Sequence, residues 1–159
     1  MDSLDPTETR LQLELEALTR EAVSGHYNDT QWTEGLQRRL CDVGRELGYE
    51  VRCSLDGGEW LYDVLWLDRV NGLIRDIPLV LESEWKQNAA TYDFDKLLVA
   101  QGRHKAMVFT ATQRHGLGGS TNRLIQRIAS CTLEQPGVRY FFAAWVNSQK
   151  RFEYQLYVV

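Results

Sequence analysis

The sequence predicts an α/β fold built on a mixed β-sheet, and three observations support this prediction. Two helix-like stretches come first, at residues 8–23 and 31–47, of which only the second has a clean apolar stripe. Three strand-like runs come next, and short turn signals separate them. Two further helices then alternate with a short buried strand before a closing hairpin. A chain of 159 residues is expected to hold all of these elements in one domain, residues 1–159.

The two N-terminal helices are indicated by their caps and by an apolar stripe. Thr7 or Thr9 can cap the first helix, and Gly25 can end it. Gly48 is a stop signal for the second helix. The apolar side chains of the second helix fall on one narrow stripe, and they are Trp32, Leu36, Leu40, Val43 and Leu47.

Three strands are predicted at residues 49–55, 59–67 and 77–86. The turn signal Asp-Gly-Gly at residues 56–58 joins the first two strands. Asn71-Gly72, a strong hairpin signal, links the second strand to the third. The three strands are therefore expected to form an antiparallel meander.

The rest of the chain alternates helices with strands. Residues 91–105 predict a helix, and residues 106–111 predict a short buried strand. Gly-Leu-Gly-Gly at residues 116–119 predicts a flexible loop, after which Ser120 or Thr121 can cap a helix to about Cys131. The amides at the start of this helix could hold a phosphate, although a plain connection is the simpler interpretation. Residues 138–146 and 151–159 predict the closing hairpin.

Composition disfavours several classes of protein. No apolar run approaches the ~20 residues of a membrane span, and the acidic N-terminus does not resemble a signal peptide, so a cytoplasmic location is expected. The three cysteines and three histidines are scattered, which argues against a disulfide framework and a zinc site. The net charge of −4 is unevenly spread, with −7 over residues 1–60 and +6 over residues 101–159. Such asymmetry fits either an anionic partner or attraction between the two ends of the chain.

Charged residues end the third strand-like run and meet an aspartate in the second. Glu82, Glu84 and Lys86 share one face of the third strand, because strand side chains alternate. Asp63 lies in the second strand, whose two faces are both apolar, so its carboxylate is expected to be substantially buried. If the hairpin turns at Asn71-Gly72, Asp63 lies opposite about position 80 and about 5–8 Å from the two glutamates.

Carboxylates this close repel each other unless a cation lies between them. Asp63, Glu82 and Glu84 are therefore predicted to bind Mg²⁺ (or Mn²⁺), which prefers oxygen ligands. Lys86 shares their face, and Lys96 lies on the next helix; either lysine can orient a metal-bound water or stabilise charge on a phosphate. The simpler alternatives are a solvated ion pair at a strand end and an aspartate that accepts hydrogen bonds from backbone amides.

An aspartate in the second strand and Glu-x-Lys in the third resemble the motif of the PD-(D/E)XK nuclease superfamily. Asp63 matches the aspartate of the motif, and Glu84-Trp85-Lys86 matches its (D/E)xK element. Tyr62 stands where the motif has its proline. Glu82-Ser83-Glu84 offers a second alignment, in which Glu82 is the ligand and Lys86 or Lys96 supplies the positive charge.

The predicted order of elements over residues 31–111 also resembles the restriction-endonuclease-like core of that superfamily. This core consists of a helix, a three-strand meander, a helix and a strand. The present chain adds an extra N-terminal helix, and a C-terminal helix plus β-hairpin.

The resemblance implies metal-dependent hydrolysis of phosphodiester bonds in nucleic acid, more readily in DNA than in RNA. A homodimer or a larger assembly suits the cleavage of a duplex, because two cuts need two sites related by symmetry. The alternative is a nuclease-fold module that has lost catalysis and acts in nucleic-acid binding or protein assembly. Basic residues of the C-terminal part are the expected phosphate contacts, and they are Arg103, Lys105, Arg114, Arg123 and Arg127.

Overall fold

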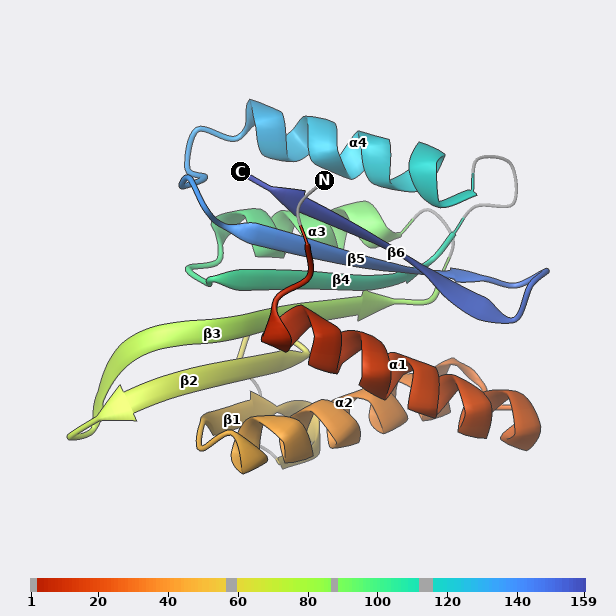
Figure 1. Ribbon diagram of the computed structural model, residues 1–159, viewed down its shortest axis with the longest axis horizontal. Coiled ribbons are helices and arrows are strands. Elements are labelled where there is room, and N and C mark those ends of the chain that lie inside the picture. The colour runs from red at the N-terminus through yellow and green to blue at the C-terminus, as the bar shows by residue number, and fades with distance from the viewer. Residues whose placement is uncertain (1–2, 57–59, 87–88, 112–115) are drawn as a thin grey trace.

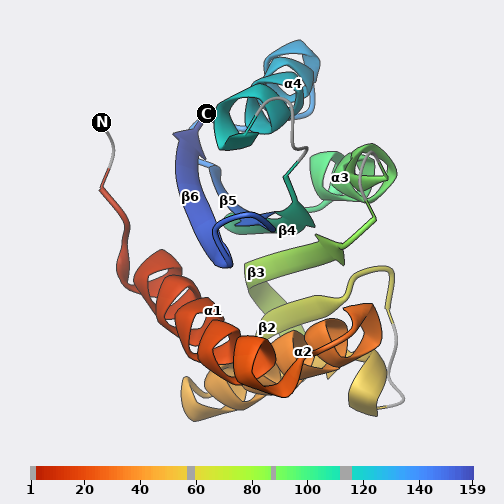
Figure 2. The same ribbon diagram turned by 90° about the vertical axis from the view of Figure 1, so that its right-hand side faces the viewer.

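The computed structural model describes residues 3–56, 60–86, 89–111 and 116–159. Within these ranges, six strands form one mixed sheet and four α-helices cover it (Figure 1). Figure 2 shows α1 (Pro6–Gly25) and α2 (Asp29–Glu46) on one face of the sheet and α3 (Ala90–Val99) and α4 (Gly116–Ser130) on the other. The predicted mixed α/β architecture is therefore confirmed. Among the described residues, no helix is both long enough and apolar enough to cross a lipid bilayer.

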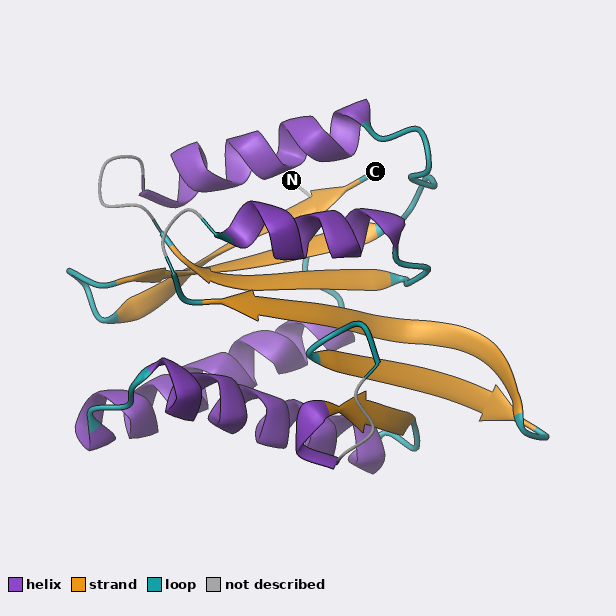
Figure 3. Ribbon diagram, turned by 180° about the vertical axis from the view of Figure 1, so that it is seen from behind, coloured by secondary structure: helices purple, strands orange, loops and turns teal. Residues whose placement is uncertain are grey.

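The elements follow the chain in the predicted alternation. Figure 3 shows that the hairpin of β2 and β3 extends beyond the rest of the sheet. In chain order the elements are α1 (Pro6–Gly25), α2 (Asp29–Glu46), β1 (Glu50–Cys53), the 3₁₀ turn η1 (Ser54–Asp56), β2 (Val64–Val70), β3 (Leu73–Glu84), α3 (Ala90–Val99), β4 (His104–Thr110), α4 (Gly116–Ser130), β5 (Arg139–Val146) and β6 (Arg151–Val158).

The spatial order of the strands equals their order in the chain. β1, β2 and β3 are antiparallel neighbours, which confirms the predicted meander. β4 runs parallel to β3, and β5 runs parallel to β4, because α3 and α4 each return the chain to the starting end of the sheet. β6 pairs antiparallel with β5 as the predicted closing hairpin. The carboxyl ends of β3, β4 and β5 therefore lie together at one end of the sheet (Figure 1).

Both faces of the sheet are buried, and this explains why its central strands are nearly all apolar. One core lies under α1 and α2 and contains Trp66, while the other lies under α3 and α4 and contains Phe94. Along β3, Leu81 enters the first core and Val80 enters the second. Glu82 follows the face of Val80 by alternation, so a charged side chain enters the layer between β3 and α3.

The start of α1 differs from the prediction because Asp5 caps the helix. The Glu8 N–H donates to Asp5 Oδ1 over 3.1 Å, and the Asp5 N–H donates to Glu8 Oε2 over 2.9 Å, which is a capping box. Pro6 follows the cap at a position where its missing N–H is not needed. Thr7 and Thr9 therefore lie inside the helix, and their predicted capping role is wrong.

The β2–β3 hairpin turns at Asn71-Gly72, as predicted. Both residues have positive φ, 51° for Asn71 and 79° for Gly72, which suits a two-residue hairpin turn. The strands continue right up to this turn, so the third strand begins at Leu73 instead of residue 77. The second strand begins at Val64, so Asp63 lies directly before this strand and not within it.

Two irregularities change the register of this hairpin. Near the turn, Val70 pairs with Leu73, as a simple hairpin requires. Register shifts on either side of Asp68 then displace the pairing, so that Val64 pairs with Leu81. Continued by one residue, this register brings Asp63 beside Glu82 instead of opposite position 80.

Helix α3 ends at Val99, which corrects the helix predicted over residues 91–105. The chain must approach β3 closely after this helix, and Gly102 makes the approach possible. A Cβ atom at Gly102 would lie 2.7 Å from Val80 Cγ2. β4 then begins at His104, two residues before the predicted start.

Two smaller corrections concern chain segments next to the sheet. α4 begins at Gly116, so residues 116–119 belong to a helix and not to a flexible loop. The first strand ends at Cys53, because the chain turns there into η1.

Candidate active site

Asp63 is held by two hydrogen bonds from one residue of β3. Its Oδ2 accepts the Ser83 N–H and the Ser83 hydroxyl, each over 2.7 Å. Burial raises the pKa of the half-buried Asp63 carboxyl, and the two bonds from Ser83 offset this effect only in part. These bonds fix Asp63 at the carboxyl-terminal part of β3, next to Glu82.

Glu82 is buried at the end of β3, with 1% of its side chain exposed. Its Oε2 lies 2.9 Å from Lys96 Nζ. Its Oε1 is buried and has no hydrogen-bond partner among the described residues. The pKa of Glu82 is raised to about 8, mainly because the carboxyl is buried; the hydrogen bond from Lys96 offsets part of this effect, and the nearby Asp63 adds to it. A buried carboxylate oxygen without a partner is unfavourable, so this atom is available to a cation or to a hydrogen-bond donor.

Lys96 extends from α3 toward the same point. Its Nζ lies 2.9 Å from Glu82 Oε2 and 2.9 Å from Asp93 Oδ1. Burial alone lowers the pKa of Lys96, but the two carboxylates outweigh burial and raise it. The amino group therefore stays charged beside Glu82.

Three residues of this cluster were missed in the sequence interpretation. Ser83 positions Asp63, and Asp93 positions Lys96. Tyr62 is half-buried; burial raises the pKa of its phenol, and the charge of Glu82 raises it further, so this side chain lies near the carboxylate. Only Asp93 had a usable signal, because it precedes Lys96 by three residues on a helix.

Glu84 and Lys86 lie farther out than Glu82. Glu84 is half-buried, and its Oε1 accepts the backbone N–H of Lys86 over 2.7 Å. Lys86 is exposed and makes no ion pair with a described acidic residue. The structure therefore brings Glu82, Asp63 and Lys96 together, but it does not bring Lys86 to Glu82.

The predicted metal ligands are only partly assembled. The carboxylate oxygens of Asp63, Glu82 and Glu84 do not all lie within 4.8 Å of one another. Asp63 is turned toward Ser83, and Glu84 is turned toward the backbone N–H of Lys86. The unpartnered Oε1 of Glu82, next to Asp63, nevertheless fits a hard divalent cation, because both groups are carboxylates.

A different trio does converge in the described part of the chain. Ligand atoms of Asp5, Glu8 and His104 lie within 4.8 Å of one another. His104 Nε2 lies 2.6 Å from Asp5 Oδ2, and Arg139 donates to both oxygens of Glu8, over 2.6 and 2.7 Å. These contacts fasten the start of α1 to the starts of β4 and β5. The trio therefore has a structural role at the start of β4, and this part of the sheet lies away from Glu82.

Two of the predicted phosphate contacts lie at that same distant end of the sheet. Arg103 precedes β4 and pairs with Asp76. Lys105 is buried, with 3% of its side chain exposed, and its Nζ lies 2.8 Å from Glu134 Oε1. Lys105 is therefore neutralised inside the protein, whereas Arg103 is paired at the surface, with 64% of its side chain exposed.

The other predicted phosphate contacts belong to α4 and to the stretch before it. Arg127 pairs with Asp95 on α3. Arg123 is exposed, nearer the start of α4, and makes no ion pair with a described acidic residue. Arg114 lies outside the described residues.

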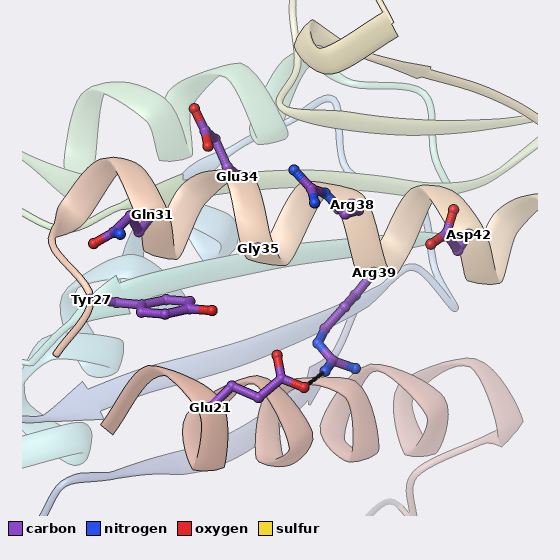
Figure 4. A pocket seen from close by; sticks show the side chains of 8 residues that line it. All are labelled: Glu21, Tyr27, Gln31, Glu34, Gly35, Arg38, Arg39 and Asp42. Carbon is purple, nitrogen blue, oxygen red and sulfur yellow. Dashed lines mark hydrogen bonds and ion pairs between the residues drawn. The ribbon is translucent and has the colours of Figure 1, made fainter. Parts of the chain in front are cut away.

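A hollow of about 430 Å³ lies between α1 and α2 (Figure 4). Arg39 extends from α2 and pairs with Glu21 on α1, and it also lies 3.1 Å from Glu14. Charges of both signs line the hollow, with Arg38 opposed by Glu34 and Asp42. This mixture favours helix-to-helix ion pairing over the binding of an anion.

No family model matches this chain, and comparisons with curated proteins and with solved structures give no significant match. Its function is therefore inferred from the geometry and chemistry of the site.

The buried carboxyl of Glu82 should make stability depend on pH. Its pKa is raised from 4.5 to about 8 in the folded state, so the folded protein binds a proton more tightly than the unfolded chain. This contribution to stability is present below about pH 4.5 and is lost as the pH rises through about 8, with a slope of up to about 1.4 kcal/mol per pH unit. Urea unfolding in EDTA at several pH values should show this fall in wild type. Glu82→Gln should flatten it, and parallel curves for the two proteins would contradict the prediction.

Proposed function

We propose that this protein is a metal-dependent nuclease of the PD-(D/E)XK type that hydrolyses phosphodiester bonds, more readily in DNA than in RNA. The observation that carries the proposal is the state of Glu82. Its carboxylate is buried, one oxygen contacts Lys96, and the other has no partner among the described residues. Such a group suits a cation site better than a structural ion pair, which would satisfy both oxygens.

The order and pairing of the elements support the same class. α2, the meander β1–β2–β3, α3 and β4 follow one another, and β4 is parallel to β3. This is the order expected of a restriction-endonuclease-like core. The site also lies where the motif would place it, at the end of the third strand of the meander and next to the start of the second.

Asp63 and Glu82 are the proposed ligands of Mg²⁺ or Mn²⁺, and Glu84, two residues farther along the same face of β3, is proposed to act through a water. The bound ion would lower the pKa of a water molecule and neutralise the scissile phosphate. Ser83 orients Asp63 through two hydrogen bonds. Lys96 is the working lysine, because it alone of the two candidates contacts Glu82, and Asp93 fixes its amino group.

Calorimetry with Mn²⁺ and Mg²⁺ tests the proposed site directly. Wild type should bind Mn²⁺, and Asp63→Ala or Glu82→Gln should bind it at least about tenfold more weakly, because each variant removes a carboxylate oxygen from the ion. Asp95→Ala is the matched control, since Asp95 lies on the surface of α3 with 46% of its side chain exposed. It should bind the ion like wild type.

Cleavage of supercoiled plasmid and of single-stranded DNA in Mn²⁺ completes the test. Wild type should nick at least one of these two substrates. Asp63→Ala and Glu82→Gln should nick neither of them under the same conditions. If wild type binds neither Mn²⁺ nor Mg²⁺, the proposal fails. The catalytically inactive binding or assembly module would then be favoured.

A further inference from the structure

A hollow of about 380 Å³ opens at the same end of the sheet as Glu82 and Glu84, but on the opposite face. It lies between the end of α1, the start of α2 and the turn that joins β5 to β6. Trp85 lines it, and this residue directly follows Glu84 in the chain. The volume is in the range of small-ligand sites.

The aromatic side of this hollow is rigid. The ring of Trp85 lies 5.2 Å from the ring of Trp32, which lies 4.9 Å from the ring of Trp145. Trp32 and Trp145 are buried. They support the rings of Trp85 and Tyr27, which are partly exposed. Trp85 Nε1 donates to Thr33 Oγ1 over 2.9 Å, and this bond fixes the orientation of the ring. The result is a preformed surface for stacking a flat ligand.

The rim of the hollow supplies charge and hydrogen-bonding groups. Lys150 is exposed in the β5–β6 turn and makes no ion pair with an acidic residue in the described part of the chain. His26, also exposed, stands at the end of α1. Asp29 and Thr110 add acceptor groups. A flat ligand with both an anionic group and polar edges complements this combination.

We propose that the hollow binds an unpaired nucleobase of single-stranded nucleic acid, with Lys150 contacting an adjacent phosphate. This inference rests on the proposed function for its placement. Glu84 and Trp85 are consecutive and lie on opposite faces of the sheet, so a strand that crosses this end passes from the acidic site to the aromatic one. A base inside a duplex cannot enter such a hollow, because its faces are already stacked.

Fluorescence anisotropy tests the stacking step separately from any chemistry. The probe is a labelled oligothymidylate of about 12 nucleotides, titrated with protein in EDTA. Trp85→Leu should bind it about tenfold to a hundredfold more weakly than wild type, because stacking on an aromatic ring is the main contact of an unpaired base. Trp85→Phe is the matched control, since it loses the same bond to Thr33 but keeps a ring, and it should stay within about fivefold of wild type.

The charge on the rim has its own control. Lys150→Gln should weaken binding of the probe by about threefold to tenfold and should reduce the slope of log affinity against log salt by about 0.7, the value for one phosphate of a single strand. Arg20→Gln removes an equally exposed positive charge from α1 outside the hollow, and it should change neither quantity.

Photo-crosslinking locates the base without any substitution in the protein. An oligonucleotide that carries one 5-iododeoxyuridine should crosslink to Trp85 or Tyr27 of wild type. The inference is overturned if the crosslink lies elsewhere, if Trp85→Leu binds the probe within twofold of wild type, or if a duplex of the same sequence binds as tightly as the single strand.

The proposed function and this inference fail in different ways. Glu82→Gln should bind the probe in EDTA at least as tightly as wild type, since the hollow lies on the other face of the sheet and the variant can only remove a negative charge near the phosphates. Probe binding that depends on Trp85, without cleavage in Mn²⁺, would support the inference and reject the nuclease. Cleavage by wild type in Mn²⁺, together with normal probe binding by Trp85→Leu, would support the nuclease and reject the inference.

Discussion

Lys96→Gln should lower the rate of plasmid nicking in Mn²⁺ by about 10²–10³-fold, while Lys86→Gln should keep the rate within about threefold of wild type. The difference arises because Lys96 Nζ lies 2.9 Å from Glu82 Oε2, whereas Lys86 is exposed and only its backbone N–H contacts Glu84. Both variants make the same chemical change to a lysine near the end of β3, so each is the control for the other.

Calorimetry distinguishes a lost catalytic group from a lost metal. Lys96→Gln removes a cation that competes for Glu82 Oε2, so the variant should bind Mn²⁺ at least as tightly as wild type while it cleaves more slowly. If both lysine variants lost nicking activity to a similar extent, the prediction that Lys96 and not Lys86 is the working lysine would be contradicted. Weaker Mn²⁺ binding by Lys96→Gln would show that the lysine mainly supports the ligands.

Trp66→Ala should cost about 3–5 kcal/mol of the free energy of unfolding, which is a large part of the stability of an ordinary domain. Trp66 is fully buried, its Nε1 donates to Leu40 O over 3.0 Å, and its ring stacks on Tyr49 at 5.7 Å. Gly44 lies so close that a Cβ there would stand 2.6 Å from Trp66 Nε1, so the ring packs directly against the backbone of α2 and its removal leaves a cavity there.

Thermal and urea unfolding measure this loss. A decrease of this size should lower Tm by about 10 °C for a chain of this length. Trp60→Ala is the matched control, because Trp60 is 43% exposed, and its loss should stay within about 1 kcal/mol. Equal losses in the two variants would mean that the α2–sheet core is not what holds the fold together.

The parts of the fold that could be predicted are those with a local signal. Asn71-Gly72 fixed the hairpin because both residues adopt the positive φ that the turn needs. The periodicity of α2 was clear because four residues of the predicted stripe, Trp32, Leu36, Leu40 and Val43, lie in the core that contains Trp66. The fifth, Leu47, follows the end of the helix and is 54% exposed, so its place in the stripe was predicted wrongly. The meander followed from the order of these elements, whereas the parallel pairing of β4 with β3 was not predicted.

The parts that could not be predicted depend on contacts between distant segments. Gly102 closely approaches Val80 just after the end of α3, and no pattern within the helix reveals this contact. The burial of Lys105 depends on Glu134, a residue that comes after α4. Charge in the sequence therefore indicated a basic region, but the fold pairs three of its predicted cations, Arg103, Lys105 and Arg127, with carboxylates.

The candidate site was predictable in its residue types but not in its partners. Glu82 and Asp63 stood out as carboxylates among apolar residues. The choice of Lys96 over Lys86 required the packing of α3 on β3, because the two lysines are equivalent by charge alone. Ser83 gave no signal, since a serine between two glutamates has no distinctive pattern.

The displaced pairing on either side of Asp68 makes the site sensitive to the length of the hairpin arms. Asp63 comes beside Glu82 only because the two shifts move the register before the strand ends. Residues in the outer half of the hairpin, such as Leu73 at 74% exposure, can change identity with little effect on this alignment. The removal or insertion of one residue between Trp66 and Arg69 would instead turn Asp63 to the other face of the sheet. The hairpin arms should therefore tolerate substitution far better than any change in chain length.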